Sequence, residues 1–151
     1  KRQGLSSGVG VFTNSTTLTN ERIVEALGEV EYIEAKLDTV DRRKFMLINV
    51  PHPSIRLEGV VESLAAFRRT YGGTLVVQVM LVGYSGLANY TADDASAIAE
   101  ALRRIEPSAV HLHTAYRMPR LGSVARAPPE AMESFAEELR KYGLEVRVYA
   151  G

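Results

Sequence analysis

The 151 residues of this chain include no cysteine. This absence excludes disulfide bonds, thiolate nucleophiles and any zinc site or iron–sulfur cluster held by cysteines of this chain. The formal net charge is zero, because 18 Lys and Arg residues balance 18 Asp and Glu residues. Composition therefore gives no electrostatic reason to expect a general nucleic-acid or membrane partner.

Long apolar segments are also missing. No apolar run approaches the about 20 residues that span a bilayer, and no signal-peptide pattern opens the chain. These absences favour a cytoplasmic protein without membrane contact. The hydrophobic content of 46% and charged content of 24% are typical of a soluble globular protein, and the length predicts one domain over residues 1–151.

An initiating methionine is the third absence. The chain begins Lys1-Arg2-Gln3-Gly4, a pattern that resembles the last turn of a helix followed by a capping glycine. We therefore expect a piece of a longer protein, with a processed terminus as the alternative.

Apolar periodicity predicts alternating strands and helices. Strands are expected near residues 8–13, 31–37, 74–82, 109–114 and 144–149, and helices near 20–28, 41–50, 57–71, 91–105 and 129–142. Residues 83–90 and 115–128 are expected to be loops. This order predicts an α/β fold with a parallel sheet, specifically a partial TIM-like barrel of about four to five parallel βα units.

Polar side chains recur on one face of the predicted strands. Alternation places Glu34, Lys36 and Asp38 together on one strand, Gln78 on the next, and His111 with His113 on a third. If these groups were buried against helices without hydrogen-bond partners, each would destabilise the fold by roughly several kcal/mol. A barrel interior or an open concave face suits them better. Functional groups in βα folds collect at the carboxyl ends of the strands, which here carry Asn14, Lys36 to Asp38, and Thr114 to Arg117.

Several of these residues also have simpler interpretations. Two histidines at i and i+2 are a potential pair of metal ligands, but two ligands do not make a metal site, and hydrogen-bonded imidazoles are the favoured interpretation. Glu34 and Lys36 could form a structural ion pair. Residues Asp41 to Lys44 are expected to be a solvated helix face. The arginines at 117, 120 and 126 could hold a phosphate or carboxylate, or simply lie in a solvated loop.

Five stretches together resemble one family. They are FTNST (12–16), YIEAKLDTVDRRKF (32–45), INVPHPSIRLEGVVESL (48–64), VVQVMLVGYSG (76–86) and VHLHTAYRMP (110–119). Their order is similar to the later half of radical S-adenosylmethionine enzymes, near the pyruvate formate-lyase activators and the wyosine-forming tRNA enzymes. The resemblance implies a partial (βα)6 barrel of which this chain begins just before the third strand.

The resemblance also implies roles for individual residues. Contacts to S-adenosylmethionine would come from five positions: Asn14, Lys36, Asp38, Gln78 and His113. The substrate cavity would include Glu34, His111 and Arg117. A [4Fe–4S] cluster would belong to the missing N-terminal part of the parent, which would cleave S-adenosylmethionine to a 5′-deoxyadenosyl radical, so this fragment alone is expected to be inactive. By the same resemblance, tRNA is an alternative partner.

The sequence departs from the family pattern at several points. Tyr84-Ser85-Gly86 replaces the usual Asn-Asp, and Val50 replaces the Arg that precedes Pro51. Two other functions also stay open. One is a half-barrel assembly module that dimerises through the exposed edge strand at residues 8–13. The other is a phosphate-binding βα enzyme that uses the arginine-bearing loop.

Overall fold

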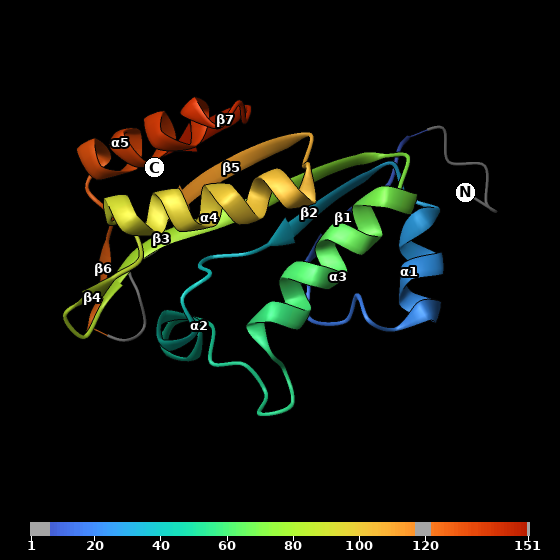
Figure 1. Ribbon diagram of the computed structural model, residues 1–151, viewed down its shortest axis with the longest axis horizontal. Coiled ribbons are helices and arrows are strands. Elements are labelled where there is room, and N and C mark those ends of the chain that lie inside the picture. The colour runs from blue at the N-terminus through green and yellow to red at the C-terminus, as the bar shows by residue number, and fades with distance from the viewer. Residues whose placement is uncertain (1–6, 117–121, 151) are drawn as a thin grey trace.

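A mostly parallel β-sheet forms the centre of the molecule in the computed structural model, which describes residues 7–116 and 122–150 (Figure 1). Among these residues the main strands follow the order β1-β2-β3-β5-β7, and each neighbouring pair is parallel. Their bounds are β1 Gly10–Thr13, β2 Tyr32–Lys36, β3 Thr74–Tyr84, β5 Ala109–Thr114 and β7 Val146–Tyr149. The predicted α/β architecture with parallel βα units is confirmed.

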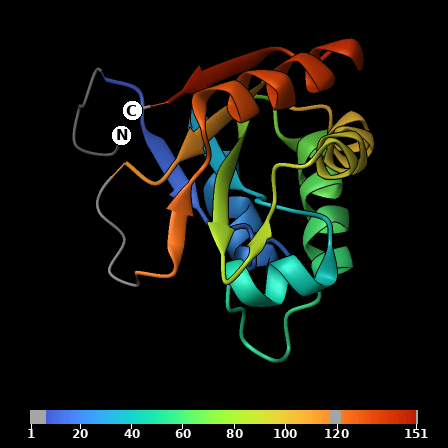
Figure 2. The ribbon, with the colours of Figure 1, turned by 90° about the vertical axis from the view of Figure 1, so that its left-hand side faces the viewer.

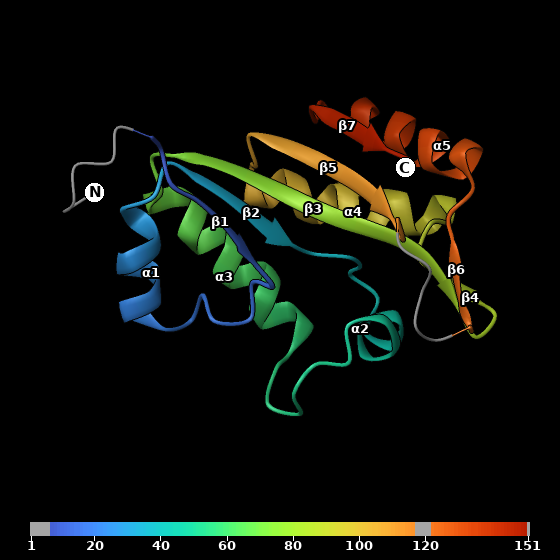
Figure 3. The ribbon, with the colours of Figure 1, turned by 180° about the vertical axis from the view of Figure 1, so that it is seen from behind.

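Helices follow the strands along the chain. They are α1 Glu21–Gly28, α2 Arg42–Ile48, α3 Leu57–Thr70, α4 Ala92–Ile105 and α5 Pro129–Lys141. Helices α3 and α4 lie in front of the sheet in Figure 1 and behind it when the molecule is seen from the back in Figure 3. Figure 2, which looks along the sheet from one end, shows these helices on one side of the strands. The opposite face of the sheet is left without a helical layer in the described part of the chain.

Local sequence signals explain where the helices begin. Asn20 caps α1 and accepts a hydrogen bond from the Arg22 N–H, while Asp41 caps α2 and accepts one from the Lys44 N–H. Thr91 and Asp94 form the predicted capping box of α4, and Pro129 occupies the first turn of α5. The predicted helix starts are therefore confirmed.

The hydrophobic core lies between the helices and one face of the sheet. Alternate strand residues such as Ile33, Val77 and Leu112 are completely buried there, and they meet the apolar stripes of α3, α4 and α5. The period-2 alternation of each strand turns the intervening residues toward the other face. That face carries the polar groups, as the alternation predicts.

Two segments that we expected to be loops contain strands. The end of β3 turns through Ser85 and Gly86, both with positive φ (49° and 80°), into β4 (Leu87–Ala88), which pairs with it antiparallel. Strand β6 (Val124–Arg126) pairs antiparallel with the same end of β3. The prediction of loops at 83–90 and 115–128 was wrong in this respect, because strands of two or three residues leave almost no periodic pattern. No helix in the described part of the chain is long and apolar enough to cross a membrane.

Candidate functional site

A cavity of about 420 Å³ lies at the carboxyl ends of β1 and β2. Its lining includes Asn14 after β1, Lys36 and Asp38 after β2, and Asn49 at the end of α2. The segment that joins α2 to α3 closes the other side. The fold therefore brings Asn14, Lys36 and Asp38 to one cavity at the edge of the sheet where βα proteins place their functional groups.

Asp38 holds the polar side chains of this cavity in place. It is 2% exposed, and its Oδ1 accepts a hydrogen bond of 2.8 Å from the Met80 N–H. Its Oδ2 accepts 2.6 Å from Asn49 Nδ2 and lies 3.0 Å from Lys36 Nζ. Because both carboxylate oxygens are occupied, Asp38 acts as a positioning residue. It holds the Lys36 ammonium, whose side chain stays 35% exposed, at the cavity.

Asn49 brings an unusual polar atom to the same cavity. Its Nδ2 is bound to Asp38, but its Oδ1 is buried without a hydrogen-bond partner among the described residues. Buried acceptors are rarely left unpaired, since the loss of hydration costs about 1–3 kcal/mol. The next residue, Val50, has φ 43°, a left-handed conformation that a β-branched residue rarely adopts. A strained backbone at Val50 and an unpaired buried acceptor on Asn49 are therefore adjacent at the cavity wall.

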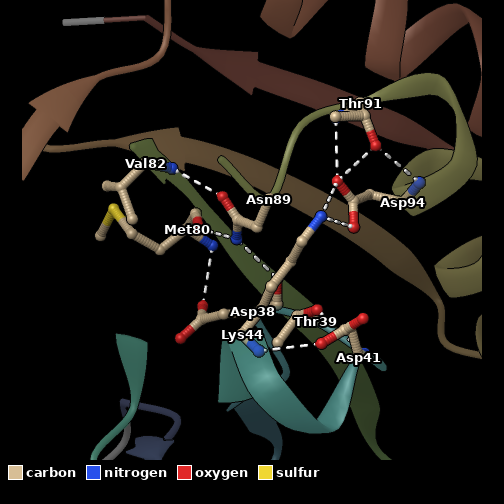
Figure 4. Close-up of polar contacts among 9 residues, drawn as sticks. All are labelled: Asp38, Thr39, Asp41, Lys44, Met80, Val82, Asn89, Thr91 and Asp94. Atoms are coloured by element: carbon tan, nitrogen blue, oxygen red, sulfur yellow. Dashed lines mark hydrogen bonds and ion pairs between the residues drawn. The ribbon is translucent and has the colours of Figure 1, made fainter. Parts of the chain in front are cut away.

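Asn89 fixes the end of β2 to β3, a role that sequence reasoning missed. The residue is 1% exposed, and its Nδ2 donates to the carbonyls of Asp38 and Met80, both at 2.8 Å. Its Oδ1 accepts from the Val82 N–H at 2.8 Å, as Figure 4 shows. The only sequence signal was a polar residue between a Ser-Gly turn and a helix cap, which a surface loop would also carry.

Helix α2 is held to α4 by a partly buried ion pair. Lys44 Nζ lies 2.6 and 2.7 Å from the two carboxylate oxygens of Asp94, and the side chains are 16% and 9% exposed (Figure 4). Asp41, Arg42 and Arg43 are exposed as predicted, but the interpretation of Lys44 as part of a solvated helix face was wrong. The reason is that α2 turns Lys44 toward the first turn of α4.

A second polar cluster lies on the uncovered face of the sheet and centres on Glu34, which is 6% exposed. Tyr32 Oη donates to Glu34 Oε2 at 2.8 Å, and Gln78 Nε2 donates to Oε1 at 2.7 Å. His111 Nδ1 and His113 Nε2 lie 3.5 and 3.8 Å from the same Oε1. Glu34 is therefore not the partner of Lys36, which pairs with Asp38 instead.

Aromatic packing and burial shape the protonation of this cluster. The His113 ring stacks on Tyr149, with centroids 4.6 Å apart and planes 9° apart, and His111 meets the same ring edge-on at 5.1 Å. Burial lowers the pKa of His113, an effect that the Glu34 carboxylate partly opposes. Burial and the hydrogen bond to Glu34 raise the pKa of Tyr32 to about 12.

The predicted site residues thus separate into two groups. Asn14, Lys36 and Asp38 line the cavity, whereas Gln78, His111 and His113 gather around Glu34. The two groups adjoin, because Lys36 and Gln78 are paired positions of β2 and β3. Arg117 and Arg120 lie outside the described residues, and Arg126 donates to the Tyr116 carbonyl. The expectation of a phosphate-binding arginine loop therefore stays untested.

The fold is shared with solved structures of known enzymes. Over 93% of its length the chain superposes on 39% of a radical SAM methyltransferase from Sphaerobacter thermophilus, with a TM-score of 0.69 and 17% identity. It also matches a domain of pyruvate-formate lyase-activating enzyme from Bacteroides vulgatus, with a TM-score of 0.73 and 16% identity over 98% of this chain and 83% of that domain. The fold is that of the partial TIM-like barrel of radical SAM enzymes, which confirms the expected fold class.

Curated relatives are found at lower coverage. The chain is 29% identical over 111 residues to the UPF0026 protein MJ1312 of Methanocaldococcus jannaschii, a match that covers 74% of this chain and 34% of the relative. A UPF0026 protein of Helicobacter pylori is 27% identical over 104 residues, which is 69% of this chain and 32% of the relative. The chain thus spans about a third of the length of the curated relatives it matches. No family model matches the chain.

Proposed function

We propose that this chain forms a later part of the barrel of a radical S-adenosylmethionine enzyme and that its cavity binds part of S-adenosylmethionine. The observation that carries the proposal is the cavity at the carboxyl ends of β1 and β2, where Lys36, Asn14 and the orphaned Asn49 Oδ1 meet. The fold shared with radical SAM enzymes supports it. The activity and substrate of a longer parent protein are part of this proposal.

The groups at the cavity suit the methionyl or ribose end of such a molecule. The Lys36 ammonium is held by Asp38 and partly exposed, so it can pair with a carboxylate or donate to a hydroxyl. The buried Asn49 Oδ1 can accept a hydrogen bond from an ammonium or hydroxyl group. Apolar contacts come from Phe45 and Ile55, which also line the cavity. A ligand whose charged or hydroxyl-bearing end meets Lys36 and Asn49, and whose carbon atoms pack against Phe45 and Ile55, matches this lining.

The iron–sulfur cluster does not fit this chain. A [4Fe–4S] cluster is held by cysteine thiolates, and these 151 residues contain none. Its ligands must therefore come from outside the chain. Beside a reduced cluster, S-adenosylmethionine supplies a radical that abstracts hydrogen, whereas the residues of this chain bind and orient the ligand. We accordingly expect the isolated chain to bind without cleaving it.

Calorimetric titration of the 151-residue chain with S-adenosylmethionine tests the binding part of this proposal. Replacing Lys36 by Met removes the cavity cation and should weaken binding by at least about tenfold, which corresponds to about 1.4 kcal/mol for one charge-assisted contact. Lys141→Met is the matched control, because Lys141 is exposed at the end of α5 and pairs with Glu138. Binding that is absent, or equal in both variants, would refute the proposal.

The sequence that precedes Lys1 in the parent gene tests the enzymatic part. The proposal requires three closely spaced cysteines upstream, in the same polypeptide. An upstream reading frame without them would refute a radical mechanism even if the cavity binds its ligand.

A second candidate function, that of an assembly unit, is favoured by the open edge of the sheet. In the described residues β1 ends the strand order, and Phe12 on this strand is 73% exposed. An open edge strand invites pairing with another strand. We propose under this candidate that β1 pairs with the same strand of a second copy. Sedimentation of the 151-residue chain should then show a dimer, and a strict monomer at high concentration would refute this candidate.

A further inference from the structure

We propose that Glu34, His111 and His113 form a binding site for a divalent transition metal on the uncovered face of the sheet. The three side chains offer one carboxylate oxygen and two imidazole nitrogens, and these atoms all lie within 4.8 Å of one another. This site adjoins the cavity at the strand ends but uses different donor atoms, and its test does not require S-adenosylmethionine to bind.

The spacing of the donor atoms is close to what a metal requires. Zinc–nitrogen and zinc–oxygen bonds of about 2.0–2.2 Å in a tetrahedron place neighbouring ligand atoms about 3.4 Å apart. Here the Glu34 Oε1 lies 3.5 Å from His111 Nδ1 and 3.8 Å from His113 Nε2. Small side-chain rotations would bring all three donors to bonding distance. The sequence placed Glu34 and both histidines on one face of the predicted sheet, but hydrogen-bonded imidazoles were favoured there because two histidines alone do not make a metal site.

One donor atom lacks the partner that a purely structural cluster would give it. His113 Nε2 is buried and has no hydrogen-bond partner among the described residues. Its distance of 3.8 Å to Glu34 Oε1 is too long for a hydrogen bond. Because buried polar atoms are normally satisfied, an unpaired imidazole nitrogen beside a carboxylate indicates that a further group belongs there.

Charge balance points to a cation. The Glu34 carboxylate is 6% exposed and receives hydrogen bonds from two neutral groups, Tyr32 and Gln78. The nearby cations have other partners: Lys36 pairs with Asp38, and Arg147 pairs with Glu145 at 2.9 Å. A buried carboxylate is costly unless it is paired or coordinates a metal.

Surrounding groups hold the donors as the outer shell of a metal site does. Tyr32 and Gln78 orient the Glu34 carboxylate, and Tyr149 packs against both imidazole rings. Such outer contacts fix ligand orientation and typically change metal affinity by about 10–100-fold when removed. Two histidines and one carboxylate leave further coordination positions for water or a substrate, and this donor set suits Zn²⁺, Fe²⁺ or Co²⁺.

The test is calorimetric titration of the EDTA-treated 151-residue chain with Zn²⁺, together with the visible absorption of bound Co²⁺. We expect one equivalent to bind, with Co²⁺ spectra of a site with nitrogen and oxygen ligands. His113→Gln and His111→Gln should each lower the affinity by at least about 100-fold, since direct ligands matter more than the outer contacts. Tyr32→Phe should lower it by about tenfold and leave the stoichiometry unchanged.

His52→Gln is the matched control, because His52 is exposed on the loop after α2 and hydrogen-bonds Ser54. Its metal affinity should equal that of the unmodified chain. Circular dichroism confirms that each variant is folded, and Tyr32→Phe retains the ring, so a folded variant is available even if a histidine variant is not. The proposal is overturned if Zn²⁺ does not bind, if folded His111→Gln and His113→Gln variants bind it normally, or if Tyr32→Phe and His52→Gln are indistinguishable.

Discussion

The ion pair between Lys44 and Asp94 should contribute a measurable coupling energy to the stability of the fold. Both side chains are largely buried, at 16% and 9% exposure, and Nζ contacts both carboxylate oxygens. We consider the variants Lys44→Met, Asp94→Asn and their combination. The pair joins α2 to α4, so it stabilises the position of the helix whose end forms part of the cavity wall.

The expected magnitudes follow from the partners that each variant leaves behind. Asp94 also accepts hydrogen bonds from the Thr91 N–H at 3.0 Å and Thr91 Oγ1 at 2.6 Å, so Lys44→Met leaves the carboxylate partly satisfied and should cost about 1.5 kcal/mol. Asp94→Asn leaves the Lys44 ammonium without a charged partner and weakens the capping box of α4. It should lower the free energy of unfolding by about 2.5 kcal/mol. The double variant should also cost about 2.5 kcal/mol, which gives a coupling energy of about 1.5 kcal/mol.

Urea denaturation followed by circular dichroism measures these free energies of unfolding. The matched control is the exposed pair of Lys141 with Glu138, whose coupling should be too small to resolve. The coupling of Lys44 with Asp94 should also persist in high salt, because salt screens a partly buried pair much less than an exposed one. A coupling energy below about 0.5 kcal/mol, or one that salt abolishes, would refute the inference that this pair fixes α2.

Three further predictions concern the elements around the cavity and the core. Asn89→Ala should lower the free energy of unfolding by about 3 kcal/mol in urea denaturation, because it removes three buried hydrogen bonds to the backbone; a loss below about 1 kcal/mol would contradict this role. Val50→Asn should raise the melting temperature, by the equivalent of about 1 kcal/mol, since Val50 is 76% exposed and Asn tolerates its φ of 43°; an unchanged or lower value would show that the strain is absent. Burial raises the pKa of Tyr71, whose hydroxyl donates to the Val30 carbonyl at 3.0 Å. The neutral phenol of Tyr71 is therefore favoured in the folded state. Its contribution to the free energy of unfolding is fully present below about pH 10 and is lost as the pH rises through the raised pKa. Tyr71→Phe should accordingly reduce the fall in stability as the pH rises above about 10, and an identical fall in both proteins would contradict the assignment.

Local patterns were sufficient for most of the architecture. The alternation of Ile33 and Ala35 with Glu34, and the 3.6-residue stripe that includes Leu57, Val60 and Leu64, each determine which face of an element is buried. Capping residues such as Asp41 and Thr91 then fixed the helix starts, because their side chains bond to backbone groups only three residues away. These interactions are local in the chain, so the sequence predicts them well.

The contacts of the candidate site are not local, and this is where prediction failed. Glu34 was a plausible partner for Lys36, two residues away, but the parallel register of β2 and β3 places Gln78 within reach of Glu34 and the turn after β2 brings Asp38 to Lys36. Asn89 was equally ambiguous, since its three backbone partners lie on β3 and on the segment after β2, which only the folded sheet brings together. The sequence predicts which face of the sheet a residue lies on. Strand register and the packing of α2 then determine which side chain it pairs with.

The two polar clusters form successive layers along the same strands. Glu34 and Lys36 are two residues apart on one face of β2, a separation of about 6.6 Å along the strand. Gln78 lies beside Lys36 in register and donates to Glu34, so it is the side chain that connects the layers. A ligand at the strand ends and a metal on Glu34 would therefore be close enough to interact through Gln78.

Gln78→Leu should weaken Zn²⁺ binding by about tenfold, because it frees one carboxylate oxygen of Glu34 to rotate. If the two sites are coupled, binding of S-adenosylmethionine should also change the affinity for Zn²⁺, and that change should disappear in the same variant. If S-adenosylmethionine does not change the Zn²⁺ affinity of the unmodified chain, the two sites lie on the same face of the sheet but are not coupled.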